Sequence, residues 1–153
     1  MPAIDNFLAA KRIAFIGVSR NPKEFSRMLF REFRTRGYDV VPVHPDAREI
    51  EDLVSYPSID AVTPPPEAAM LLLPKPKLAD AVRACGAAGV RLVWAYGVTG
   101  EKEIPADAHA AAAEHGLDFI AGHCPFMLLP DTGAIHRFHG WIWSLLGKMP
   151  ERV

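Results

Sequence analysis

The chain has 153 residues, a formal net charge of −1 and hydrophobic residues at half of its positions. This length fits one domain, so we expect a single domain over residues 1–153. The composition excludes a disordered or membrane-spanning chain, and the near-zero net charge argues against nucleic acid or a membrane surface as partner. The N-terminus lacks the basic start of a signal peptide and the two cysteines show no repeated spacing, so we expect a cytoplasmic protein.

The first predicted elements are a strand, a helix and a second strand. Residues 12–17 form a short apolar run that ends in glycine, which is typical of a buried parallel strand. Asn21 and Pro22 are residue types that favour a helix N-terminus, with Asn21 as the N-cap and Pro22 at the first helical position. We therefore predict a helix from Pro22 to Gly37, followed by a strand over residues 38–43.

Basic residues concentrate around this helix. Residues 11–36 contain eight basic and two acidic side chains, a local balance of 8 − 2 = +6. We predict that Arg31, Arg34 and Arg36 lie on a solvated helix face, where the last of them complement the helix dipole. Arg20 and Lys23 lie at the opposite end and are candidates for binding an anion.

Proline shapes the middle of the chain, and regular alternation follows it. Three prolines at 64–66 exclude a crossover helix there, and one short strand is expected near residues 53–56. The later predicted elements are strands over 69–73, 91–95 and 117–121 and helices over 76–89, 105–115 and 138–146. This alternation predicts an α/β, Rossmann-like, doubly wound and mostly parallel sheet of five to six strands with helices on both faces.

The predicted strand order, 3-2-1-4-5-6, places the strand before Gly17 beside the strand that ends at Leu73. Ligands in such sheets bind outside the carboxyl ends of the strands, where the winding reverses. Free N–H groups at a helix N-terminus favour an anion there, and a hydroxyl and two cations add to that preference. The first turn therefore predicts a diphosphate site, and its residues are Gly17, Ser19, Arg20, Asn21, Pro22 and Lys23.

Two nucleotide fingerprints are missing from this turn. A dinucleotide site reads GxGxxG, whereas this chain has Ser19 and Pro22 in place of the second and third glycines. The second strand ends in a His-Pro pair, with Asp46 only beyond the proline, and no GxxxxGK[ST] P-loop occurs. An NAD(P)-binding oxidoreductase-like domain is therefore the second hypothesis, and a structural protein with a vestigial pocket is the third.

Several segments resemble one family along most of the chain. They are Ile16–Lys23, Gly37–Pro45, Tyr56–Ile59, Gly89–Trp94, Gly116–Leu117 and Cys124. In combination they resemble the small stand-alone CoA-binding proteins, which are similar to the N-terminal CoA-binding domain of the succinyl-CoA synthetase alpha subunit. The chain departs from that family at His44, where asparagine is usual, and after Trp94, where glutamine often precedes glycine.

The resemblance implies a ligand and places its parts. It implies that coenzyme A or an acyl-CoA binds with its diphosphate at Gly17, Ser19, Arg20 and Lys23. It further implies that the adenosine part and its surroundings are contacted by Val43, His44, Pro45, Leu73, Pro74, Lys75 and Gly97. The synthetase's catalytic machinery lies in a further domain, so the resemblance supports binding and we predict no catalytic residue.

Other chemically active residues leave alternatives open. His123, Cys124, His136 and His139 could ligate zinc or iron, yet their spacing matches no zinc template, and we favour loop histidines with a buried cysteine. A small acyl-CoA enzyme using His123, Cys124 or His136 remains an alternative, as does a disulfide between Cys124 and the thiol of CoA. The apolar tail around Trp141 and Trp143 predicts a homodimer contact.

Overall fold

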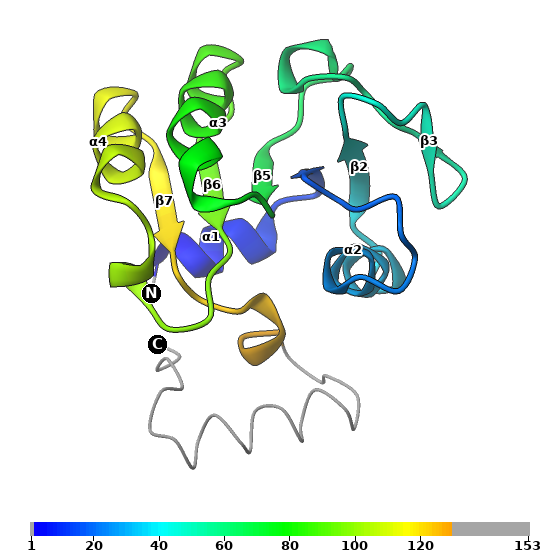
Figure 1. Ribbon diagram of the computed structural model, residues 1–153, viewed down its shortest axis with the longest axis horizontal. Helices are drawn as coiled ribbons and strands as arrows, with labels where there is room; N and C mark the ends of the chain where they lie inside the picture. Colours follow the sequence, from blue (N-terminus) through cyan, green and yellow to red (C-terminus); the bar gives the residue numbers. More distant parts are fainter. Residues whose placement is uncertain (1, 130–153) are drawn as a thin grey trace.

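The computed structural model of the protein describes residues 2–129, and its centre is a five-stranded parallel sheet (Figure 1). The strands lie in the order β2-β1-β5-β6-β7, and every neighbouring pair is parallel. Their bounds are β1 Arg12–Ile16, β2 Asp39–Val43, β5 Ala68–Leu71, β6 Leu92–Ala95 and β7 Asp118–Ala121. The predicted α/β class is therefore confirmed, with five strands in the sheet.

The predicted third strand does not join this sheet. β3 (Glu49–Ile50) and β4 (Leu53–Val54) instead pair with each other as an antiparallel hairpin. Only Tyr56 reaches the outer edge of the sheet, in a single parallel bridge to Val43. The hairpin turns at residues 51–52, and Pro57, which has no N–H to donate, follows Tyr56, so pairing with β2 stops at this single bridge.

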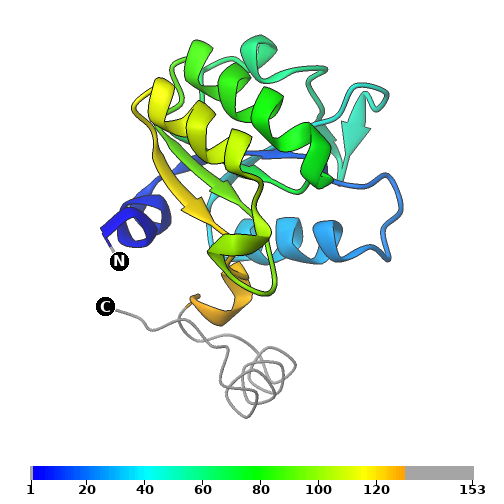
Figure 2. The same cartoon turned by 60° about the vertical axis from the view of Figure 1, so that its left-hand side comes forward.

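Helices cover both faces of the sheet (Figures 1 and 2). α1 (Pro2–Ala9) and α2 (Phe25–Thr35) pack on one face, and α3 (Lys75–Ala87) and α4 (Ala106–Glu114) pack side by side on the other. None of these helices, nor any other in residues 2–129, is long and apolar enough to cross a membrane. The sheet is thus buried on both faces, which explains why its strands read as continuous apolar runs.

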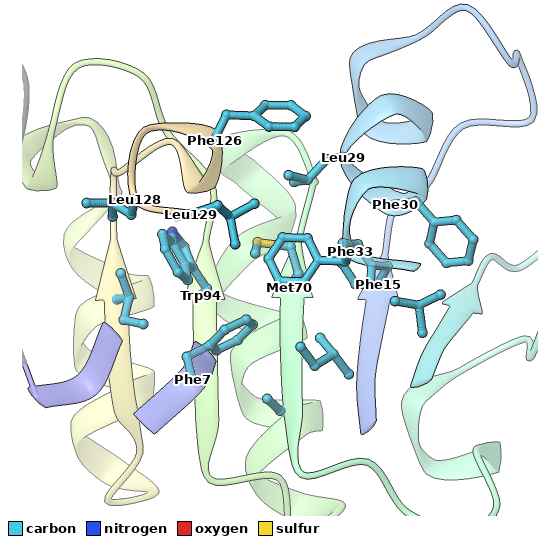
Figure 3. Close-up of a cluster of buried hydrophobic side chains, with 14 of the residues drawn as sticks. Phe7, Phe15, Leu29, Phe30, Phe33, Met70, Trp94, Phe126, Leu128 and Leu129 are labelled. Carbon is cyan, nitrogen blue, oxygen red and sulfur yellow. The ribbon is translucent and has the colours of Figure 1, made fainter. Parts of the chain in front are cut away.

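The two faces have different cores. The α1 and α2 side is rich in aromatic side chains, and Figure 3 shows Phe7 beside Trp94 and Phe33 beside Phe15. Aliphatic and alanine side chains fill the α3 and α4 side. A 3₁₀ turn over Pro125–Met127 closes the aromatic core at the carboxyl ends of the strands (Figure 3).

The structure corrects one helix prediction and adds one helix. α2 begins at Phe25, because Asn21 forms a separate turn in which its side chain and carbonyl accept the N–H groups of Lys23 and Glu24. α1 was not predicted, although its buried Ile4 and Phe7 have helical spacing. The helix expected over 138–146 and the tail expected to form a dimer contact lie outside the described residues.

Candidate functional site

A cavity of about 490 Å³ lies where β1, β2 and β5 end, on the face of the sheet that α3 covers. Its volume falls within the range of small-molecule sites. The lining comes from the strand ends, from the loop that contains a 3₁₀ turn over Ile59–Ala61, and from α3. This position, outside the carboxyl ends of parallel strands, is where open α/β sheets hold ligands.

The cavity brings together part of the predicted site. Predicted residues in its lining are Gly17, Ser19, Val43, His44, Pro45, Leu73 and Pro74. Predicted residues outside its lining are Arg20, Asn21, Pro22, Lys23, Lys75 and Gly97. The first four of these continue the turn on the exposed surface, while Gly97 is buried in another loop.

The lining also contains polar residues that sequence analysis missed. They are Asp46, Ser58, Asp60 and Lys77. Lys77 shares one face of α3 with Ala81 and Ala84, and this helical spacing was the available signal. Ser58 and Asp60 follow Pro57 in an irregular loop, where no periodicity marks them.

Gly17 joins the ends of three strands. Its φ is +95°, and a Cβ built there would lie 2.4 Å from the Leu72 carbonyl oxygen. Its own N–H donates to the Val43 carbonyl at 3.3 Å, while the Leu72 N–H donates to the Ile16 carbonyl at 2.8 Å. Glycine is therefore required here by the close approach of β5 as well as by the turn.

Several N–H groups of the first turn donate hydrogen bonds to side chains. The N–H of Ser19 donates to Ser26 Oγ at 2.9 Å, that of Asn21 to Ser19 Oγ at 3.0 Å, and that of Lys23 to Asn21 Oδ1 at 3.0 Å. The expectation that this turn presents a row of free N–H groups is wrong for these residues, because the turn forms its own structure before α2 begins. The N–H of Arg20 has no partner within residues 2–129.

Arginines of α2 converge on Glu51 in the β3–β4 hairpin. Arg27 and Arg31 each donate Nε and Nη2 to the Glu51 carboxylate, and Arg34 donates to the Glu51 carbonyl. Arg34 is exposed and Arg31 partly exposed, as the predicted solvated face requires, but both also bind the hairpin, an acceptor that is distant in sequence. Arg36 is engaged as well, through Glu32 on the same helix.

Because of this network, the free energy of unfolding depends on pH under acidic conditions. Hydrogen bonds from Arg31 and then Arg27 lower the pKa of Glu51 from 4.5 to about 2. Because the folded-state pKa is depressed, the stabilisation is complete above pH 4.5 and is lost as pH falls toward 2. We expect Glu51→Gln to cost about 2 kcal/mol of unfolding free energy at pH 7 and much less at pH 2.5.

Urea denaturation at both pH values measures this difference. Glu32→Gln is the matched control, since it removes a carboxylate from a single pair with Arg36 on the same helix. An equal cost for Glu51→Gln at pH 7 and pH 2.5 would contradict the assignment.

Gly97 has a structural role in the loop after β6. A Cβ there would lie 2.6 Å from Glu103 Oε2 and 2.7 Å from Gly122 Cα. Glu103 Oε2 also accepts the N–H groups of Val98 and Thr99, at 2.6 and 2.9 Å. The tight packing of two loops thus accounts for this glycine without a ligand.

His123 and Cys124 follow β7, outside the lining of the cavity. Burial raises the pKa of the Cys124 thiol and lowers the pKa of His123. Both groups are therefore neutral at pH 7, and a protonated thiol is a poor nucleophile. Residues 2–129 hold no group of three or more side chains placed to bind a metal, and His136 and His139 lie outside the described residues.

The fold and the position of the cavity define a Rossmann-like α/β domain with a crevice at the carboxyl end of its sheet. Residues 11–130 match the family model described as CoA binding domain. The chain therefore belongs to the CoA-binding domain family, and the resemblance stated from the sequence is confirmed.

Related proteins agree with this assignment. The acetate–CoA ligase (ADP-forming) II subunit alpha of Pyrococcus furiosus is 26% identical over 132 residues, which are 79% of this chain and 28% of that subunit. A hypothetical protein from Pyrococcus horikoshii OT3 superposes with a TM-score of 0.71 and 26% identity, covering 80% of this chain and 84% of that one. A dinucleotide-forming acetyl-coenzyme A synthetase 1 of Ca. Korarchaeum cryptofilum gives a TM-score of 0.54 and 26% identity, covering 67% of this chain and 24% of that one. This chain thus spans about a quarter of each of the two larger relatives.

Proposed function

We propose that this chain binds coenzyme A or an acyl-CoA in the crevice at the ends of β1, β2 and β5, without catalysing a reaction itself. The observation that carries the proposal is the cavity that joins Gly17 and Ser19 to the ends of β2 and β5, in a member of the CoA-binding domain family. The similarity to a subunit of an acetate–CoA ligase supports the same ligand class.

The geometry suggests how the ligand divides between cavity and turn. The cavity has apolar walls from Val43, Ile59 and Leu73, which suit an adenine ring, and Lys77 lies in the same lining. The exposed part of the turn carries Arg20 and Lys23, whose charges suit a diphosphate. Under this proposal the adenosine lies in the cavity and the diphosphate lies along the turn.

Absence of catalysis is the second part of the proposal. An acyl-CoA enzyme would need a nucleophile or base at the acyl group, and the Cys124 thiol, one candidate, is buried, which raises its pKa. The hypothesis of a disulfide between Cys124 and the CoA thiol meets the same obstacle. The burial of Cys124 therefore argues against this thiol as the nucleophile of an acyl-CoA reaction.

Ligand titration of the purified, ligand-stripped protein tests the proposal. CoA, NAD⁺, NADP⁺ and ATP are compared by thermal unfolding and calorimetry, and CoA at a hundredfold its dissociation constant should add about 2.7 kcal/mol of stability. Ser19→Ala should weaken CoA binding about tenfold, because it removes a hydroxyl from the phosphate site.

Thr35→Ala is the matched control, since it removes a hydroxyl at the far end of α2. Preference for NAD⁺ or NADP⁺ over CoA would replace the proposed ligand by a dinucleotide. No stabilisation by any of the four nucleotides would contradict the proposed function.

A further inference from the structure

The β3–β4 hairpin and the first turn are distant in sequence, but guanidinium groups of α2 join them. Arg27 and Arg31 contact the Glu51 carboxylate on one side and carbonyl oxygens of the turn on the other. Arg31 donates Nη1 to the Pro22 carbonyl at 3.0 Å. The turn is thus held from behind by the helix that follows it, and that helix is held by the hairpin.

Arg27 controls the direction of two peptide groups in the turn. Its Nη1 donates to the carbonyl oxygens of Ser19 and Arg20, each at 3.2 Å. The peptide bonds that follow these carbonyls are trans, so the N–H group of each unit points away from Arg27. One of these N–H groups, that of Asn21, donates to Ser19 Oγ, whereas that of Arg20 has no partner within residues 2–129.

Glu51 sets the orientation of Arg27. The Arg27 side chain has only 10% of its surface exposed, and a guanidinium buried to that extent requires a charged partner. Glu51 accepts both Nε and Nη2 of Arg27, which leaves Nη1 directed at the turn. Arg31 binds the same carboxylate and thereby fixes Glu51 from a second side.

We propose that Glu51 is a positioning residue for the ligand's diphosphate, acting through Arg27 on the Ser19–Arg20 peptide. The Glu51–Arg27 pair keeps the carbonyl oxygens of the turn facing α2. The Arg20 N–H and the Ser19 hydroxyl are thereby presented to the phosphate oxygens. Without this pair the peptide can rotate and direct a carbonyl dipole toward the diphosphate. This inference rests on the proposed binding of CoA in this crevice.

ADP and adenosine differ only in the diphosphate. Comparing their affinities therefore distinguishes a positioning role of Glu51 from a general effect on stability. We expect Glu51→Gln to weaken ADP binding about tenfold and adenosine binding less than about twofold, because only ADP uses the oriented turn. Arg27→Lys keeps the charge but cannot reach the carboxylate and both carbonyls together, so it should show the same selective loss. Calorimetry for ADP and NMR titration for adenosine, at temperatures where each variant is folded, measure both constants.

Glu32→Gln is the control, because it removes the partner of Arg36 on the same helix without touching the turn. It should leave both dissociation constants unchanged. Equal losses for ADP and adenosine in Glu51→Gln and Arg27→Lys would show a merely structural role and overturn the inference, as would unchanged ADP binding. Failure of the unmodified protein to bind CoA or ADP would instead overturn the proposed function and, with it, this inference.

Discussion

Replacing Gly17 with alanine is expected to destabilise the protein by about 3 kcal/mol and to abolish ligand binding. The added Cβ would lie 2.4 Å from the Leu72 carbonyl oxygen and 2.9 Å from Leu73 Cδ2, at a φ of +95°. Leu72 cannot move aside easily, because its N–H is bonded to the Ile16 carbonyl in the sheet. Urea denaturation gives the loss of stability, and calorimetry with CoA gives the loss of binding.

Gly89 also has a positive φ, so it distinguishes the cost of this backbone conformation from the cost of a collision with Leu72. Gly89 has a φ of +85°, but a Cβ there would meet no described atom within 4 Å. Gly89→Ala should therefore cost only the conformational penalty, about 1 kcal/mol, and should leave CoA binding intact. Equal losses of unfolding free energy for Gly17→Ala and Gly89→Ala would mean that the backbone after β5 moves to admit the Cβ. Gly17 would then be required only for its positive φ.

Truncation of Trp94 is expected to cost about 4 kcal/mol. This side chain is fully buried, its ring meets Phe7 edge-on with centroids 5.2 Å apart, and its Nε1 donates to the His123 carbonyl at 3.0 Å (Figure 3). Trp94→Ala removes all of these contacts and leaves a large hole between α1 and the sheet. Thermal and urea unfolding measure the loss.

Trp94→Phe is the matched variant, since it retains an aromatic ring and loses the hydrogen bond. It should cost about 1–2 kcal/mol. Trp94 lies on the α1 face of the sheet, whereas the cavity lies on the α3 face, so Trp94→Phe should leave the affinity for CoA unchanged. A cost for Trp94→Ala no larger than that for Trp94→Phe would mean that the surrounding core refills the hole.

These variants test two separate parts of the molecule. The Gly17 pair tests whether the crevice depends on the close junction of β1 and β5. The Trp94 pair tests the aromatic core on the opposite face, which supports the sheet without lining the cavity. Loss of both stability and CoA binding at Gly17 can thus be distinguished from loss of stability alone at Trp94.

The five strands of the sheet and its α/β class follow from patterns in the amino-acid sequence. Parallel strands buried on both faces need continuous apolar runs, and glycines such as Gly17 and Gly89 mark where the chain turns. The short motifs of the family also lie in the sequence, since each is a local run around a strand end. Those signals were sufficient for the α/β fold and for the CoA-binding domain family.

The partners of the α2 arginines and the lining of the cavity depend instead on segments that meet only in the folded chain. Glu51 meets Arg27 across 24 residues of sequence, and no local pattern encodes such a partner. The residues expected for a third strand of the sheet pair with β3 instead, and no local pattern specifies which segment a strand pairs with. Ser58 reaches the cavity from an irregular loop that no periodicity marks. Helical spacing places Lys77 on one face of α3 with Ala81 and Ala84, but the segments that this face meets are set by the fold.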